Sequence, residues 1–320
     1  KMLTLLQLFI DSPDSKAALI ECGVVNTFYN YLLRKDQERT WEKTLKCLSG
    51  LSDSITTKED KLIERLLKRF VLNNTVTNAE KSQELTRLTV KIVHDLTKIN
   101  EMNKEETSKN FKELFNQLRS LSNSSDIREL ISKIMRNCIS SSHARMSYFD
   151  LDKMTLPEFS NRNFSMLNDF ENSFINLNCL WIVTTMVVEN ETAKAELKAN
   201  RKTQKDISES FVKCLGKYSI ASEMTDEKWE IIGKTFIAFK VLDNEVLMPF
   251  KDGIKEAIGN LTANSRFDTD ATTRKNVHEF IKTSGEKELE KVYVDWGETK
   301  QEMLSQTENR SEKSLIEYWK

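Results

Sequence analysis

The stretch SPDSKAALIECGVVNTFYNYLLRKDQERTWEKTLKCLSGLSDS, residues Ser12 to Ser54, decides the fold. A Pro-Asp turn leads into a short helical pattern, and Gly23 separates it from a second pattern that opens with two valines. A third and longer helical pattern follows, with its apolar residues at Trp41, Leu45, Leu48 and Leu51. Because the chain has only 8 glycines in 320 residues, a glycine between two short apolar helices indicates the punctuation of a repeat.

The composition favours helices over sheets. Glycine and proline occur only 8 and 3 times, and sheets need frequent turns that use these residues. The formal charge is −1, from 48 basic and 49 acidic residues, so no net field attracts nucleic acid or an anionic membrane. No apolar run approaches the roughly 18 residues that span a bilayer, and the longest, Cys179 to Val188, is typical of a buried helix.

The cysteines indicate the compartment. Five of them lie far apart, at Cys22, Cys47, Cys138, Cys179 and Cys214. An odd and scattered set predicts free thiols in a reducing compartment rather than a disulfide framework. We therefore expect a cytoplasmic protein, with the nucleus as the alternative. The chain opens at Lys1 inside an apolar pattern, and we expect further residues of the protein to precede it.

Long helical patterns recur along the chain. They are predicted at residues 41–54, 85–99, 127–140, 177–190 and 229–244, and residues 2–10 look like the end of one more. A polar or small residue stands near the end of each: Gln7, Gly50, Asp95, Asn137, Thr185 and Lys240. The steps between them are 43, 45, 42, 48 and 55 residues. Irregular helical steps of this size predict a solenoid, because one helix pair or triplet cannot bury its apolar face alone.

The segment from Ser12 to Ser54 resembles an armadillo repeat. The family's short first helix ends at a glycine, matched by Gly23; its second helix is matched by VNTFYNYLL, and the ALxNL motif of its third helix by CLSGLS. CLWIVTTMVVENETAKAEL and WEIIGKTFIAFKVLDNEVLMPFKDG look like parts of further repeats. The resemblance implies an all-α, right-handed solenoid of about five to six irregular repeats with a helical C-terminal cap.

The sequence departs from the family at its groove asparagine. This residue is replaced at three positions: Gln7, Gly50 and Thr185. Only Asn137 keeps it. In importin-like members these asparagines pin the backbone of an extended peptide, so their loss argues against binding of a nuclear signal. The family's glycine is matched again at Gly253, and we expect Asn200 to substitute for it in another repeat, since asparagine tolerates the left-handed conformation.

Four segments follow from these patterns. Residues 1–140 and 175–264 are predicted as armadillo-like repeats, and residues 265–320 as capping helices. Residues 141–174 are predicted as an insertion rich in aromatic residues, with candidate partner contacts at Tyr148, Phe149, Phe159 and Phe164. The insertion could instead fold back onto the neighbouring repeats.

No catalytic or metal-binding constellation is found in the sequence. Phosphate-binding glycine motifs and the nucleophile-elbow and zinc-protease motifs are absent. Cys138 and His143 form the one close Cys-His pair, so we expect no metal and no cofactor. His94 and Asp95 are adjacent, but neighbouring residues on a helix point apart, so we expect no contact between them.

These observations predict a non-catalytic module that binds a protein partner on the concave face of the solenoid, as a scaffold or regulator. The groove-facing candidates are Asp95, Asn137, Thr185 and Lys240, with Trp181 and Trp229 as anchors or core residues. One alternative is a chaperone or exchange-factor type of module acting on a folded ATPase, GTPase or myosin motor. A second alternative is an enzyme with its site in the aromatic insertion.

Overall fold

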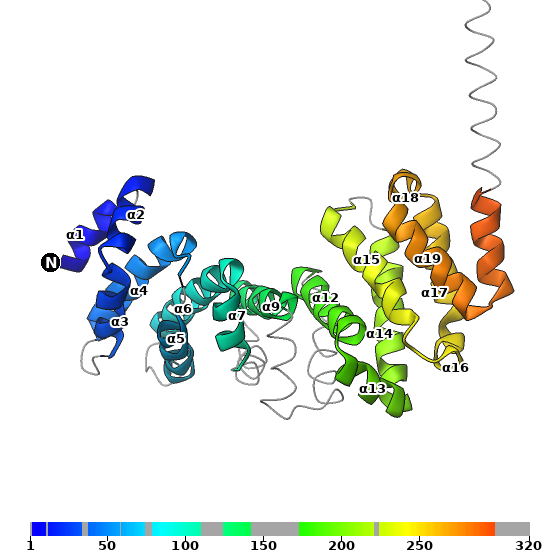
Figure 1. Ribbon diagram of the computed structural model, residues 1–320, viewed down its shortest axis with the longest axis horizontal. Helices are drawn as coiled ribbons and strands as arrows, with labels where there is room; N and C mark the ends of the chain where they lie inside the picture. The colour runs from blue at the N-terminus through cyan, green and yellow to red at the C-terminus, as the bar shows by residue number, and fades with distance from the viewer. Residues whose placement is uncertain are drawn as a thin grey trace, which may run out of the picture. The chain divides into compact units, whose positions relative to one another are not determined.

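The computed structural model describes residues 2–10, 12–33, 38–57, 59–73, 79–109, 124–141, 173–220 and 224–297 (Figure 1). Helices and their connections make up these residues, which contain no strand. The chain divides into two compact units, Lys1–Ile182 and Val183–Lys320. The predicted insertion at residues 141–174 lies outside the described residues apart from its first residue and its last two.

The first unit runs from α1 to the first half of α12. Its helices are α1 (Met2–Phe9), α2 (Pro13–Glu21), α3 (Val24–Leu33), α4 (Glu38–Leu51), the 3-10 turn η1 (Ser52–Ser54), α5 (Asp60–Asn73), α6 (Ala79–Ile99), α7 (Glu101–Ser108), α9 (Ser125–Ser140) and α12 (Ser173–Glu189). The predicted long helices therefore form at α4, α6, α9 and α12, each within a few residues of its expected bounds.

The second unit runs from the rest of α12 to the last described helix. Its helices are α13 (Glu191–Ala199), α14 (Arg201–Ser219), α15 (Asp226–Phe239), α16 (Asn244–Leu247), the 3-10 turn η2 (Met248–Phe250), α17 (Lys251–Thr262), α18 (Ser265–Thr269), α19 (Ala271–Ser284) and a helix over residues 287–297. The predicted long helix at 229–244 forms as α15.

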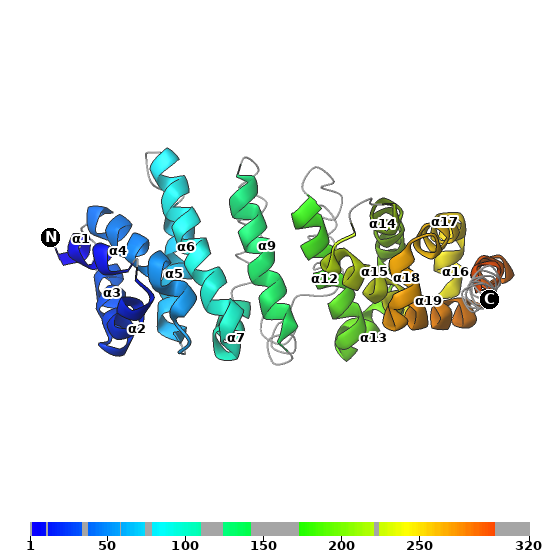
Figure 2. The same ribbon diagram turned by 90° about the horizontal axis from the view of Figure 1, so that it is seen from above.

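Successive long helices pack on one another. In the first unit α1 packs on α4, α4 on α6, and α6 on α9, and these helices lie side by side in sequence order (Figure 2). In the second unit α15 packs on α19 and α14 on α17. The long helix α19 lies beyond residue 264, where the sequence pattern fades, and it packs on α15 as the earlier long helices pack on their neighbours.

Apolar residues at helical spacing explain this packing. In α9 the buried side chains include Ile127, Ile131, Ile134 and Cys138, which recur every three or four residues and form one face. In the second unit the core is aromatic. The ring of Phe239 lies 5.4 Å from Phe280, 5.8 Å from Phe236 and 6.2 Å from Phe211, measured between centroids. These rings join α14, α15 and α19.

Single asparagines replace glycine at several helix junctions. Asn100 separates α6 from α7, and its side-chain oxygen accepts hydrogen bonds from the backbone N–H groups of Met102 and Asn103. Asn190 and Asn200 begin α13 and α14 in the same way. The expectation that Asn200 adopts the left-handed conformation is wrong: its φ is −126°, and it caps α14 instead.

The two glycines matched to the family behave differently. Gly23 follows α2 with φ of 74°, a left-handed conformation that glycine adopts without strain, and it separates two short helices as predicted. Gly253 lies inside α17, and the match of this residue to the family's glycine is wrong. A Cβ atom at this position would come within 2.7 Å of Val212 Cγ1, so close approach to α14 favours glycine there.

We expect Gly23→Val to destabilise the first unit. A β-branched residue is strained in the left-handed region by about 1–2 kcal/mol, which corresponds to a fall of roughly 2–8 °C in the thermal midpoint. Gly216→Ala is the control, because Gly216 is helical and a Cβ there meets no atom within 4 Å. Circular dichroism melting measures both. Equal midpoints for the two variants would contradict a structural role for Gly23.

All five cysteines are free, as predicted. Cys22 is exposed, whereas Cys47, Cys138, Cys179 and Cys214 are buried. Burial raises the pKa of Cys47 to about 11. It also raises the pKa of Cys138, an effect that far exceeds the opposing pull of Lys104. These two thiols are therefore protonated at neutral pH and shielded from reagents.

We expect iodoacetamide to alkylate Cys22 first in the native protein, with the four buried thiols reacting only after denaturation. The physical reason is access, since a reagent reaches only an exposed sulfur. Mass spectrometry of digests taken over time gives the order of labelling. Simultaneous labelling of Cys22 and Cys138 would contradict the burial of α9 in the core.

Candidate functional site

Three lysines occupy matching places on the successive long helices of the first unit. They are Lys46 on α4, Lys91 on α6 and Lys133 on α9, and we name them the lysine row. Their side chains are 38%, 40% and 39% exposed. Each ammonium pairs with a carboxylate one helical turn away: Glu42 at 2.7 Å, Asp95 at 2.9 Å and Glu129 at 2.6 Å respectively. For Lys46 and Lys133 the carboxylate stands four residues earlier, and for Lys91 it stands four residues later, so a paired lysine recurs on three neighbouring helices.

Contacts between helices fix the register of the row. Lys91 Nζ donates to the backbone oxygen of Ser49, 42 residues earlier, at 2.9 Å. Gln83 of α6 donates to Ser124, 41 residues later, at the start of α9. These offsets are close to the spacings from Lys46 to Lys91 and from Lys91 to Lys133, which are 45 and 42 residues. The lysine row therefore crosses α4, α6 and α9 at about one level.

Asp95 lies at the centre of a hydrogen-bonded group. Its carboxylate accepts from Ser52 Oγ at 2.6 Å and from Lys91 Nζ at 2.9 Å, and His94 Nδ1 lies 3.0 Å from its other oxygen. Partial burial by itself would raise the pKa of Asp95, but the hydrogen bonds from His94, Ser52 and Lys91 outweigh it and lower the pKa to about 2. The expectation that His94 and Asp95 do not touch is therefore wrong.

Next to the row, α9 meets the first half of α12. Arg136 places its guanidinium 5.1 Å from the ring of Trp181 and donates to Asn178 Oδ1 at 3.3 Å. Asn178 in turn donates to Ser132 Oγ at 2.9 Å. Lys133 stands 5.9 Å from the ring centre of Phe174, which is exposed. Two cations of α9 thus lie over two aromatic rings of α12.

Asn137 lies one turn beyond Lys133 on α9. Its side-chain Nδ2 is buried, and no acceptor among the described residues reaches it. Buried amide donors in folded proteins nearly always have a partner. Asn137 is also the position at which the sequence keeps the armadillo groove asparagine.

The other predicted groove residues fall into two groups. Lys240 is partly exposed, and its ammonium pairs with Glu279 of α19 at 2.6 Å. Thr185 is buried, so the prediction that its side chain faces an open groove is wrong. Trp181 and Trp229 are buried as well, which agrees with the second of their two predicted roles, that of core residues. Trp229 donates its ring N–H to Asp270, the residue that caps α19. Neighbouring helices cover these three side chains, which the sequence of one helix does not reveal.

The insertion candidates cannot be placed on the fold. Tyr148, Phe149, Phe159 and Phe164 lie outside the described residues. The lysine row, by contrast, is described and was missed by the sequence analysis. The signal was available, because each lysine stands four residues before a predicted row position: Gly50, Asp95 and Asn137.

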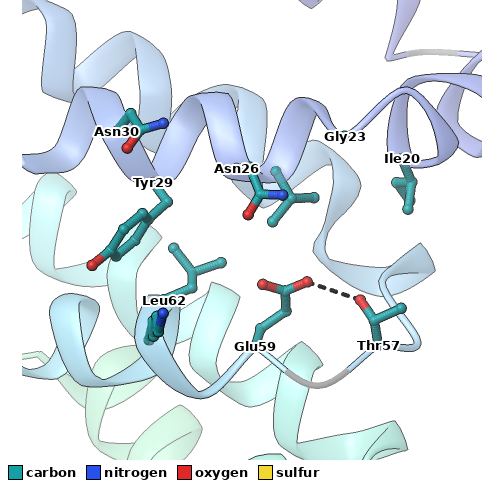
Figure 3. Close-up of a pocket in the computed structure, with 10 residues that line it drawn as sticks. Ile20, Gly23, Asn26, Tyr29, Asn30, Thr57, Glu59 and Leu62 are labelled. Carbon is teal, nitrogen blue, oxygen red and sulfur yellow. Dashed lines mark hydrogen bonds between the residues drawn. The ribbon is translucent and has the colours of Figure 1, made fainter.

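A separate cleft lies between α3 and the start of α5 (Figure 3). It has a volume of about 660 Å³, and Asn26 and Tyr29 on one side face Glu59 and Leu62 on the other. Glu59 accepts a hydrogen bond from Thr57 at 2.8 Å. The lining residues include Glu59 and Lys61 but no histidine or cysteine, so they form no familiar catalytic arrangement.

The described part of the chain contains no group of three or more His, Cys, Asp or Glu residues that could hold a metal ion. None of its helices combines the length and the apolar character that crossing a membrane requires.

Comparison with known proteins identifies the fold. No family model and no curated protein sequence matches the chain. Solved structures do match. A designed armadillo repeat protein in complex with the peptide (KR)4 has a TM-score of 0.53 and 14% identity, over 81% of this chain and 98% of that chain. Computationally designed armadillo repeat proteins for modular peptide recognition match with a TM-score of 0.53 and 13% identity, over 80% and 98%.

A natural protein system appears among the matches as well. A chain from work on a phosphorylation switch that controls the interaction between cadherin and β-catenin has a TM-score of 0.63 and 17% identity, over 92% of this chain and 58% of that chain. At these identities the likeness establishes the fold alone. The chain has the all-helical solenoid fold of armadillo-repeat proteins, as its sequence predicts.

We expect Asp95→Asn to lower the free energy of unfolding by about 2–3 kcal/mol at pH 7, because the folded pKa of about 2 lies almost two units below the unfolded value of about 3.9. The ionised carboxylate contributes fully above about pH 4, and its contribution is lost as the pH falls toward 2. Urea unfolding should therefore give the variant a lower free energy of unfolding than the parent protein at pH 7, and a smaller difference between the two at pH 3.

Glu209→Gln is the matched control for this measurement. Glu209 also pairs with a lysine one turn away, at 2.8 Å, but both side chains are about half exposed. Little change is expected, since exposed pairs contribute little. If Asp95→Asn lowers the free energy of unfolding by the same amount at both pH values, the charge of Asp95 does not contribute to stability.

Proposed function

We propose that this protein is a non-catalytic protein-binding module, acting as a scaffold or regulator, that holds an extended segment of a partner along α4, α6 and α9. The face in question carries the lysine row, the Asp95 group and Asn137. An extended segment crossing the three helices would meet a paired lysine on each. Many weak contacts of this kind are how stacked helical repeats bind their partners.

The observation that carries the proposal is the side-chain N–H of Asn137 beside the lysine row, which has no acceptor in the part of the chain that the structure describes. A buried donor without an acceptor costs about 1–3 kcal/mol, and a backbone carbonyl of a bound segment would supply the acceptor. Among proteins of similar fold, a designed armadillo repeat protein is in complex with the peptide (KR)4. This supports peptide binding as a use of the fold.

A folded partner is the second candidate. The observation in its favour is that, of the three helices, only α9 carries a side-chain amide at this position, Asn137. The matching positions on α4 and α6 are Gly50 and Asp95. A row with one amide pins a peptide backbone at fewer places than a row of amides. A chaperone or exchange-factor type of module would instead use the charged groups of the row against a folded surface.

The five free cysteines further support a reducing compartment such as the cytoplasm.

We expect Asn137→Ala to weaken peptide binding about 3–10-fold, the equivalent of one lost hydrogen bond. Binders would be selected from a random 12-residue peptide library displayed on phage, and their affinities measured by fluorescence anisotropy. The stability of the variant should not fall, because the change removes an unsatisfied buried donor. The binding loss and the unchanged melting curve together would support the proposal.

Asn30→Ala provides the control on another surface. Asn30 is exposed on α3 and lines the cleft of Figure 3. Its truncation should leave peptide affinity unchanged. If Asn30→Ala weakens the selected peptides while Asn137→Ala does not, the cleft is the binding site and the proposal for α4, α6 and α9 is wrong.

A further inference from the structure

We infer that the lysine row selects an acidic extended segment, one that offers a carboxylate to each of α4, α6 and α9. This inference rests on the proposed function and names the chemical class of the partner. It needs three things from the structure: lysines that can still donate, carboxylates that do not repel the ligand, and a spacing that one extended chain can match.

The lysines retain donors. An ammonium group has three N–H donors. The structure gives Lys46 an acceptor in Glu42, Lys133 an acceptor in Glu129, and Lys91 acceptors in Ser49 and Asp95. Each of the three side chains is also more than one third exposed. A carboxylate from solvent can therefore reach every ammonium without displacing its present partner.

The carboxylates of the row are the less exposed members of their pairs. Asp95 is 14% exposed against 40% for Lys91, and Glu129 is 26% exposed against 39% for Lys133. The carboxylate of Asp95 also accepts a hydrogen bond from Ser52 Oγ and contacts His94 Nδ1. Arg136, held over Trp181, adds a fourth cation beside the three pairs. On α6 and α9 the paired charges nearest to solvent are therefore positive, and on α4 Lys46 and Glu42 are about equally exposed.

The spacing favours one acidic residue in three. Neighbouring packed helices lie about 8–10 Å apart, and an extended chain advances about 3.3 Å per residue. Three residues of an extended segment therefore cover one step from α4 to α6, or from α6 to α9. A segment with Asp or Glu at positions i, i+3 and i+6 would place one carboxylate at each lysine.

The test uses three fluorescent 12-residue peptides that carry Glu, Gln or Lys at every third position and otherwise have one sequence. We expect the Glu peptide to bind the full chain at least tenfold more tightly than the Gln peptide, and the Lys peptide to bind most weakly. Affinity for the Glu peptide should fall steeply as salt rises from 50 to 300 mM. Equal affinities for the three peptides, or a preference for Lys, would overturn the inference.

The lysines are tested with Lys46→Gln/Lys133→Gln, which leaves the buried contacts of Lys91 intact. This double variant should lose at least tenfold in affinity for the Glu peptide and most of the salt dependence. The control is Lys68→Gln/Lys213→Gln, which removes the same charge from two lysines that also pair with a glutamate one turn earlier, on α5 and α14. An equal loss in the control would mean that overall charge, rather than the row, attracts the peptide, and would overturn the inference.

Two further outcomes separate this inference from the proposed function and from another partner class. If Asn137→Ala weakens selected peptides but the Glu peptide shows no preference, the peptide-binding face stands and the acidic specificity is wrong. A single-stranded oligonucleotide is the last probe. If it binds more tightly than the Glu peptide and also loses affinity in Lys46→Gln/Lys133→Gln, the row recognises phosphate and the inference is wrong. Weak binding of the oligonucleotide, unaffected by the variant, supports it.

Discussion

The packing of each long helix against the long helix before it and the one after it determines the rest of the first unit. In α6, Ile92 and Val93 are adjacent and both fully buried, which a helix packed on one side alone would not achieve. Such a helix needs a partner on each flank, because its apolar surface is too wide for one neighbour. The part of α6 that meets solvent is consequently narrow, and it carries Lys91. The position of the lysine row thus follows from the stacking of α4, α6 and α9.

Polar contacts set the register that apolar packing leaves open. Asn103 is buried, accepts from the backbone N–H of Glu59 at 2.8 Å, and donates to the backbone oxygens of Thr57 and Leu96, each at 3.3 Å. It holds the extended stretch around Thr57 in the part of the repeat where a short first helix would be expected. Ser52 and Asp95 tie the end of α4 to α6 in a similar way. Removal of one partner from such a buried contact leaves the other unsatisfied, so these residues specify the alignment of neighbouring helices more than they add to net stability.

Much of the fold follows from the sequence because its signals are local. The 3.6-residue period predicts α4, α6, α9, α12 and α15, and the left-handed turn at Gly23 needs only the neighbouring residues to be recognised. The errors concern contacts between helices. Position 253 favours glycine because Val212 of α14 lies close to its backbone. Thr185 is buried because other helices cover it. For the candidate site, the sequence predicted Asp95 and Asn137 but not the lysines. A lysine on the exposed face of a single helix is an ordinary feature of a solvated surface. It becomes informative only when the structure shows a lysine at the matching place on each neighbouring helix.

The lysine row contributes little to the stability of the scaffold, and this separates the site from the fold. A lysine paired with a carboxylate one turn away stabilises a helix by about 0.2–0.5 kcal/mol, so three pairs add about 1 kcal/mol to a domain whose core buries dozens of apolar side chains. The pairs have a second effect. By holding each flexible side chain in one position, they reduce the conformational entropy that a ligand would otherwise remove on binding, a cost of about 0.5–1.5 kcal/mol for each immobilised side chain. Across three lysines this saving is at least as large as the stability the pairs provide. The energetic consequence of the repeated pairing would therefore fall mainly on binding, which is the physical reason for proposing these three paired lysines as a binding surface.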